Sequence, residues 1–341
     1  MKIKISLVLV AIFFTASVQA QSDMEFIYRE LTQKDIDEVQ AIWNSRDLSP
    51  KNVEVVMETV QNSYTVKIVK HTLRSKTHYG AIVVPNRSEQ TNLPAVVIAD
   101  GLWQDNPSLN VDLMVRRNNG PASPIADFIQ IYPSYRGRIL LHLGQTFYSE
   151  GDYRDAFDGA TDDTIGMLNV AEALVPQGRF DKVAVTGHSR GGTVALLLAA
   201  RDPRINTVIA IAAPVDFYRQ EVAERWRLGN QRYGIQYTWQ FFSDKQPAES
   251  RQRMLASSPI YFKPLENVEN MFLFHGANDT SVPLWNMEAM KTHLKSFDVN
   301  VSTQVFEGRD HNNIFEDTGF GEKNRSGFST FLKKINEQGG K

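Results

Sequence analysis

Cysteine is absent from the 341-residue chain. That absence excludes disulfides, thiolate nucleophiles, iron–sulfur clusters and Cys-based zinc sites. An excess of charge of one sign is also missing, because 37 Lys and Arg face 39 Asp and Glu for a formal net charge of −2. A chain so close to neutral gives no electrostatic case for binding nucleic acid or an anionic membrane. What remains is an ordinary globular composition, with 42% hydrophobic and 22% charged residues.

Long apolar runs are rare, and the most prominent one is at the N-terminus. Lys2 and Lys4 precede an apolar run from Ile5 to Phe14, and Val18 and Ala20 then occupy the small-residue positions of a cleavage site. This pattern is typical of a secretory signal peptide, and the run is too short for a membrane-spanning helix. An uncleaved anchor is the alternative. We expect residues 1–20 to be removed near Ala20 and the mature protein to be periplasmic or secreted, without a membrane span.

Residues 21–62 precede the first clear strand. Ile36, Val39, Ile42 and Trp43 have helical spacing, and Val53–Val60 is a second short helix candidate after a Ser-Pro break. The sequence therefore predicts an N-terminal helical extension.

From residue 63 onward, to residue 341, strands and helices alternate. Two alternating segments rich in β-branched residues, Tyr64–Leu73 and Thr77–Val84, predict a hairpin. Continuous apolar runs, typical of strands covered on both faces, follow at Ala95–Ala99, Asp127–Tyr132, Lys182–Thr186, Val208–Ala212 and Met271–Phe274, with a further strand at Val299–Phe306. Helix candidates lie at Asp158–Leu174, Gly192–Ala200, Pro283–Leu294 and Lys323–Ile335. The pattern predicts an α/β fold with a mostly parallel, eight-stranded sheet flanked by helices.

One stretch breaks this alternation. Residues 217–258 contain no obvious strand but many aromatic residues, which predicts a helical cap insertion over one end of the sheet. Trp103, Trp226 and Trp239 are candidates for a substrate pocket; plain packing of the cap is the alternative.

The segment Lys182–Gly192 (KVAVTGHSRGG) carries the chemistry. It places G-x-S-x-G between an apolar strand and a helix, the context in which the serine of this motif is a nucleophile. The turn holds Ser189 in a strained conformation that lifts its hydroxyl clear of the sheet. The amide of Arg190, directly after the serine, is one candidate oxyanion donor, and Leu102, after the strand Ala95–Ala99, is the other, with Trp103 next.

A serine hydroxyl needs a base, and the base needs an orienting acid. In this topology the acid and then the histidine follow the serine. His311 lies in a polar loop directly after a strand, whereas His275 ends a strand and His293 lies within a helix, so His311 is the predicted base. Asp279, in the loop after Met271–Phe274, is the predicted acid. Glu307 and Asp310 are rivals because they are close to His311 in sequence.

Several blocks together resemble the catalytic domain of the prolyl oligopeptidase family, within the α/β-hydrolases. They are GHSRGG, Ser258-Pro259-Ile260-Tyr261, HGANDTSVP, EGRDH, Tyr135-Arg136-Gly137 and Thr161-Asp162-Asp163. The resemblance extends from about Leu93 to the C-terminus and implies the same triad, Ser189, Asp279 and His311. Two features depart from the family. The roughly 70 mature residues before Leu93 are too few for its β-propeller, and Asp100-Gly101-Leu102 supplies no tyrosine hydroxyl to the oxyanion.

None of the other sequence motifs indicates a bound cofactor. The acidic run from Asp152 to Asp163 lacks the spacing of a calcium loop and suits a helix N-terminus, so no metal is expected. A dinucleotide fingerprint and a phosphate-binding glycine loop are both absent.

We therefore expect an exported serine hydrolase that acts on a short peptide or a carboxylic ester, with the peptidase slightly favoured. A catalytically silent binding protein of the same fold is the alternative of another class. The sequence leaves the oligomeric state open.

Overall fold

The computed structural model describes residues 23–86, 91–102, 108–119, 123, 125–219, 246–297 and 299–314. The predicted signal peptide, most of the predicted cap and the last predicted helix lie outside these ranges, as do Trp103, Trp226 and Trp239. None of the helices within the described ranges is both long and apolar enough to cross a bilayer.

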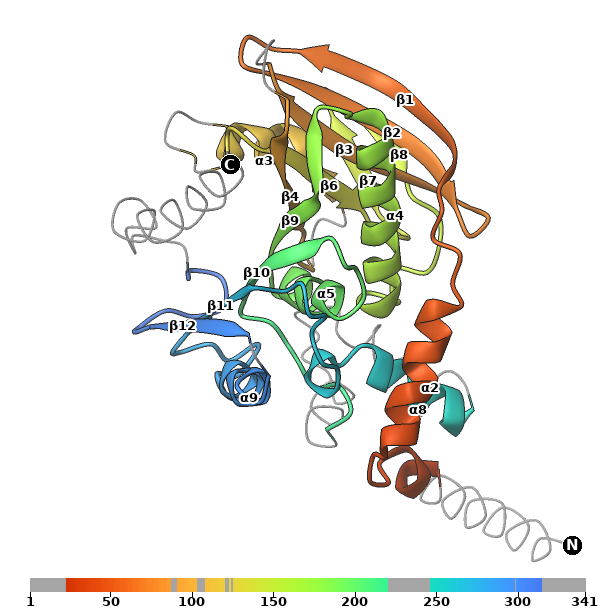
Figure 1. The fold of residues 1–341 in the computed structure, drawn as a ribbon, viewed down its shortest axis with the longest axis vertical. Helices are drawn as coiled ribbons and strands as arrows, with labels where there is room; N and C mark the ends of the chain where they lie inside the picture. The colour runs from red at the N-terminus through yellow and green to blue at the C-terminus, as the bar shows by residue number, and fades with distance from the viewer. Residues whose placement is uncertain are drawn as a thin grey trace, which may run out of the picture.

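A nine-stranded mixed sheet forms the centre of the molecule (Figure 1). In spatial order its strands are β1 (Lys51–Val60), β2 (Tyr64–Leu73), β3 (Lys76–Pro85), β6 (Ile129–Ser134), β4 (Leu93–Ala99), β9 (Gly178–His188), β10 (Ile205–Ile211), β11 (Asn270–Gly276) and β12 (Asn300–Phe306). Neighbours from β1 to β6 are antiparallel, and those from β6 to β12 are parallel. The α/β architecture is as predicted, with one strand more than the eight expected.

The additional strand corrects the prediction for Val53–Val60. This segment is not a helix but part of β1, which pairs antiparallel with β2 so that Val55 lies opposite Val69. Four valines in β1 are β-branched and stiff at χ1, which favours an extended chain once a neighbouring strand offers hydrogen bonds. The preceding helix does form, as α2 (Gln33–Asn44), and the Thr32 and Asp35 side chains close a capping box at its start. The extension is therefore a helix followed by an edge strand.

The apolar strands are buried because both faces of the sheet are covered. In β4, Ala95 and Val97 pack into one core and Val96 and Ile98 into another. The first core includes α4 (Asp158–Leu174), α5 (Arg190–Ala199) and α9 (Trp285–Leu294). The second includes α3 (Val111–Asn118) and a small sheet of β5 (Ser108–Asn110), β7 (Ile139–His142) and β8 (Gln145–Tyr148), which the sequence did not predict.

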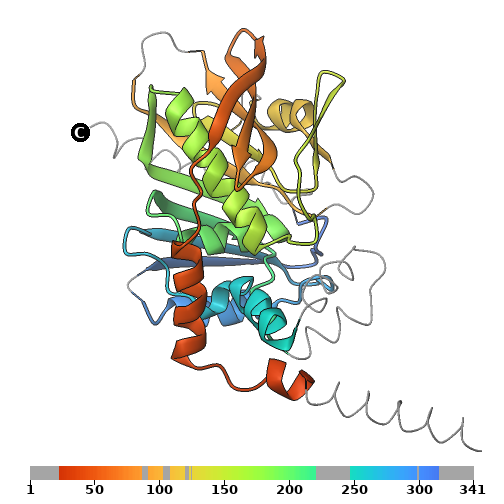
Figure 2. The same cartoon turned by 90° about the vertical axis from the view of Figure 1, so that its right-hand side faces the viewer.

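The N-terminal segment packs against the α/β part of the chain. Helix α2 lies beside α8 (Pro247–Ala256), which leads into the short 3-10 helix η2 (Pro259–Tyr261) (Figures 1 and 2). The Trp43 indole N–H donates to Asp158 at 2.8 Å, and the Arg201 guanidinium lies 4.8 Å from the Trp43 ring. Residues at the end of α2 are thus joined directly to the start of α4.

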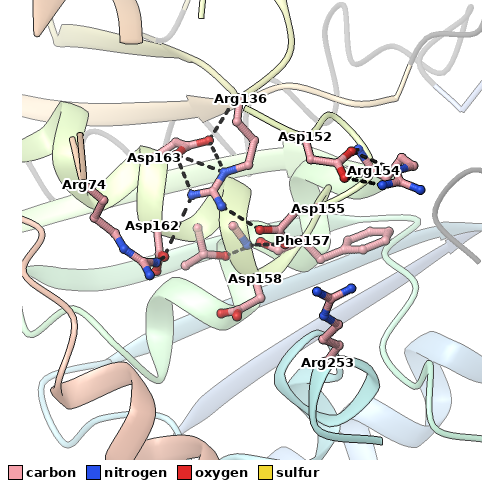
Figure 3. Close-up of polar contacts among 12 residues, drawn as sticks. Arg74, Arg136, Asp152, Arg154, Asp155, Phe157, Asp158, Asp162, Asp163 and Arg253 are labelled. Atoms are coloured by element: carbon pink, nitrogen blue, oxygen red, sulfur yellow. Dashed lines mark hydrogen bonds and ion pairs between the residues drawn. The ribbon is translucent and has the colours of Figure 1, made fainter. Parts of the chain in front are cut away.

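The predicted acidic run is the carboxylate half of an ion-pair cluster at the start of α4 (Figure 3). The Asp162 side chain is 1% exposed and accepts hydrogen bonds from Arg46 at 3.0 Å, from Arg74 at 2.9 Å and from Arg201. Burial alone would raise the pKa of Asp162, but the charges of Arg201, Arg46 and Arg136 hold it below its ordinary value. Arg136 joins the cluster by pairing with Asp163 at 2.8 Å. Arginine side chains therefore neutralise this buried charge, and the described residues contain no group of three acids or histidines arranged for a metal.

Candidate active site

Ser189 occupies a tight turn between β9 and α5. Its backbone has φ 55° and ψ −121°, a strained combination for a residue with a side chain. The Ser189 N–H donates to the Ile211 carbonyl at 2.8 Å, which ties the turn to β10. A Cβ on Gly187 would lie 2.2 Å from the Gly191 backbone, and one on Gly191 would lie 2.0 Å from the Ala99 carbonyl oxygen. Only glycine fits at these two positions, which explains the G-x-S-x-G spacing.

The structure brings the three predicted triad residues together. His311 Nε2 lies 2.9 Å from Ser189 Oγ, and His311 Nδ1 lies 2.7 Å from Asp279 Oδ2. The three residues follow β9, β11 and β12, whose carboxyl ends meet at one edge of the parallel sheet. Segments 122 residues apart in sequence therefore meet because β9 to β12 all run in the same direction and end at the same edge of the sheet.

Asp279 is fixed by its own loop. Its Oδ1 accepts the N–H groups of Ser281 at 2.9 Å and Val282 at 2.8 Å, which leaves Oδ2 for His311. Burial alone would raise the pKa of this carboxyl, but hydrogen bonds from His275 and His311 hold it well below its ordinary value. Asp279 is therefore ionised at neutral pH and receives the Nδ1 hydrogen of His311.

The rival residues have other contacts. Asp310 accepts the N–H groups of Asn312 and Asn313 at 2.8 and 2.9 Å and so closes its own turn, and Glu307 is exposed. His275 Nε2 donates to the Val282 carbonyl at 2.7 Å, within the turn that holds Asp279. His293 lies within α9 as predicted, where it is partly buried and its Nε2 donates to the Phe262 carbonyl at 3.1 Å.

The residues that carry the two predicted oxyanion donors follow neighbouring strands, β9 and β4. Arg190 begins α5, and Leu102 follows β4 at the same edge of the sheet. A Cβ on Gly101 would lie 3.3 Å from the His188 carbonyl oxygen and 4.0 Å from Ser189 Cβ, so the Gly101–Leu102 peptide is next to the nucleophile.

Sequence reasoning missed His188. Its Nε2 donates to the backbone carbonyl of His311 at 2.8 Å, and the two rings are 4.7 Å apart. Burial lowers the pKa of His188 to about 3, so the ring is neutral. It steadies the loop that carries His311. The motif gives no signal for this role because His188 fills one of its variable positions.

A strained serine at a strand–helix turn, hydrogen-bonded to a histidine and then an aspartate in this chain order, defines a serine hydrolase of the α/β-hydrolase fold. The sequence profile of the prolyl oligopeptidase family matches residues 122–336, a range that includes Ser189, Asp279 and His311. The chain belongs to that family. Comparison with curated protein sequences gives no match.

Solved structures share the fold at low sequence identity. The acylaminoacyl peptidase of Pyrococcus horikoshii is 14% identical with a TM-score of 0.59, and the match covers 80% of this chain but 42% of the peptidase. Acetyl xylan esterase 1 of Thermoanaerobacterium sp. JW/SL YS485 is 16% identical with a TM-score of 0.62, over 92% of this chain and 98% of the esterase. This chain therefore spans less than half the length of the peptidase and nearly the whole length of the esterase.

Proposed function

We propose that this protein is an exported serine hydrolase that cleaves short peptides through an acyl-enzyme, with Ser189, His311 and Asp279 as its catalytic triad. Carboxylic esters are the second candidate substrate class. The observation that carries the proposal is the hydrogen-bonded chain from Ser189 Oγ through His311 to Asp279 Oδ2. Export rests on the signal pattern of residues 1–20.

The reaction follows from this geometry. His311 Nε2 accepts the Ser189 proton as Oγ attacks the substrate carbonyl, and Asp279 stabilises the imidazolium that forms. The amides of Leu102 and Arg190 hold the oxyanion of the tetrahedral intermediate. His311 then protonates the leaving amine, which departs and leaves an ester between Ser189 and the acyl group. Water attacks this ester, His311 takes the water's proton, and a second collapse returns that proton to Ser189 and releases the acid.

Family membership favours peptide substrates. Short peptides are therefore the proposed class.

The match to acetyl xylan esterase 1 covers almost the whole length of that chain, which favours the ester alternative. An alcohol is a better leaving group than an amine. A triad that cleaves amides thus also cleaves activated esters, while the reverse does not hold. Ester turnover is expected under both candidates, and amide turnover only under the first.

The test compares aminoacyl and dipeptidyl arylamides with short-chain and long-chain aryl esters, using wild type and Ser189→Ala. Turnover of arylamides by the wild type, abolished in Ser189→Ala, supports the peptidase. Turnover of esters with every amide inert moves the assignment to a carboxylesterase. A folded wild type that turns over neither class and does not react with a fluorophosphonate is a binding protein, and the proposal then fails.

A further inference from the structure

The side chain of Arg190 points into the protein, although the backbone N–H of the same residue is a proposed oxyanion donor. Arg190 is 2% exposed, and its guanidinium lies 4.5 Å from the centre of the Tyr135 ring. Nη2 donates to the Gly101 carbonyl at 2.6 Å, and Nε donates to the Asp100 carbonyl at 3.2 Å. The guanidinium is therefore bound to the backbone of the loop that carries the other proposed donor.

The Gly101 carbonyl and the Leu102 N–H belong to the same peptide group. A trans peptide is planar, and its C=O and N–H point in opposite directions. A donor that fixes the Gly101 oxygen therefore also fixes the direction of the Leu102 hydrogen on the opposite edge. A charged donor on that oxygen also polarises the peptide, which strengthens the bond that the N–H makes.

Other buried groups hold the same loop. The Tyr135 hydroxyl accepts the Asp100 N–H at 3.1 Å. Arg138 Nη1 donates to Asp100 Oδ2 at 2.7 Å and to the Gly101 carbonyl at 3.3 Å. The Asp100 carboxylate thus faces two guanidiniums, Arg138 and, at 4.0 Å, Arg190. Burial, and then repulsion from Arg138, lower the pKa of Arg190 to about 9, so its side chain is still charged at neutral pH.

We propose that the Arg190 side chain is a positioning residue for the oxyanion hole, holding the Gly101–Leu102 peptide so that the Leu102 N–H faces the developing negative charge. One residue then organises both donors, the first through its own backbone and the second through its guanidinium. Its positive charge behind the loop also favours the oxyanion. This inference rests on the proposed acyl-transfer role of Ser189.

The test measures kcat and KM for p-nitrophenyl acetate in Arg190→Gln and Arg190→Lys. We expect kcat to fall about 100-fold in Arg190→Gln with KM within about threefold of wild type, because the lost stabilisation exists only in the transition state. Arg190→Lys keeps a charge and one donor, and we expect its kcat to be about tenfold higher than that of Arg190→Gln. Affinity for a phenylboronic acid, which forms a tetrahedral anion on the serine, should fall in parallel with kcat.

A matched control separates this role from stability. Arg201 has a similarly buried side chain that pairs with Asp158 and Asp162, away from the oxyanion loop. Arg201→Gln should lower the melting temperature while leaving kcat unchanged. A kcat for Arg190→Gln within threefold of wild type, or a raised KM at unchanged kcat, overturns the proposal.

A second variant covers the case in which Arg190→Gln does not fold. Tyr135→Phe removes only the hydroxyl that accepts the Asp100 N–H, and circular dichroism verifies its fold. We expect kcat to fall about fivefold at constant KM, because the loop loses one of its hydrogen bonds. An unchanged kcat in both Tyr135→Phe and Arg190→Lys rejects the positioning role. If the wild type turns over substrate and the variants are fully active, the positioning role is refuted but the proposed function is not. If the wild type shows no turnover, the proposed function is refuted as well.

Discussion

Replacing Asp279 by Asn tests whether this carboxylate sets the tautomer of His311. In the native loop Oδ1 accepts two backbone N–H groups, from Ser281 and Val282, and Oδ2 faces His311 Nδ1 at 2.7 Å. In the Asp279→Asn variant the amide oxygen must take the place of Oδ1, because an NH2 group there would face two donors. The NH2 then faces Nδ1, which has to become an acceptor. The neutral ring carries its hydrogen on Nε2 and can no longer accept the Ser189 proton.

The size of the effect follows from the two interactions that change. Turning the amide over would leave one buried and one part-buried N–H group unpaired, at a cost of about 3 kcal/mol. Loss of the charged acceptor for the imidazolium costs about 2.5 kcal/mol more. The sum, about 5.5 kcal/mol, corresponds to a fall in kcat of about 10⁴. Steady-state hydrolysis of an aryl ester measures this fall, and ¹⁵N NMR of His311 reports the hydrogen on Nε2.

The matched control is Asp310→Asn. Asp310 is adjacent to His311 and accepts two backbone N–H groups at 2.8 and 2.9 Å, which an Asn oxygen accepts equally well. We expect its kcat to stay within about twofold of wild type. The reasoning is refuted if Asp279→Asn keeps more than about a tenth of wild-type kcat, or if Asp310→Asn is the slower enzyme.

Three further predictions concern stability and folding. Asp162→Asn should lower the unfolding free energy by about 3 to 5 kcal/mol, because it removes the charged partner of buried arginines. Asp152→Asn, in a more exposed ion pair, should lower it by less than about 1 kcal/mol. Urea melts measure both values, and equal losses contradict the burial argument. His71 is 1% exposed, and burial lowers its pKa to about 4, so the unfolded chain binds a proton between pH 6.5 and 4 that the folded chain does not. Stability from this group is complete above pH 6.5 and falls by about 3 kcal/mol as pH drops to 4, and His71→Leu should flatten that slope; an unchanged slope rejects the prediction. Gly191→Ala puts a Cβ 2.0 Å from the Ala99 carbonyl oxygen, so it should fold poorly or lose activity, and a stable, fully active variant would contradict the close backbone approach in this turn.

Much of the site could be predicted because its signals are local. The glycines around Ser189 report close backbone approaches within one turn, and the apolar run before them identifies a strand covered on both faces. Asp279 and His311 could be selected because each follows a strand, and parallel strands place their carboxyl ends at one edge. The strand at Lys51–Val60 could not be selected in this way, since its conformation depends on hydrogen bonds to β2.

The sequence by itself determined the nucleophile, the order of acid and base, and the class of fold, because neighbouring residues carry that information. Only the tertiary structure decided what the arginines do. The contact from Arg190 to Gly101 joins residues 89 positions apart, and that from Arg46 to Asp162 joins residues 116 positions apart. A guanidinium on a long flexible side chain has no preferred partner in the sequence. Its partner is determined only by the folded structure, which excludes water and places a carbonyl or carboxylate within hydrogen-bonding distance of the guanidinium.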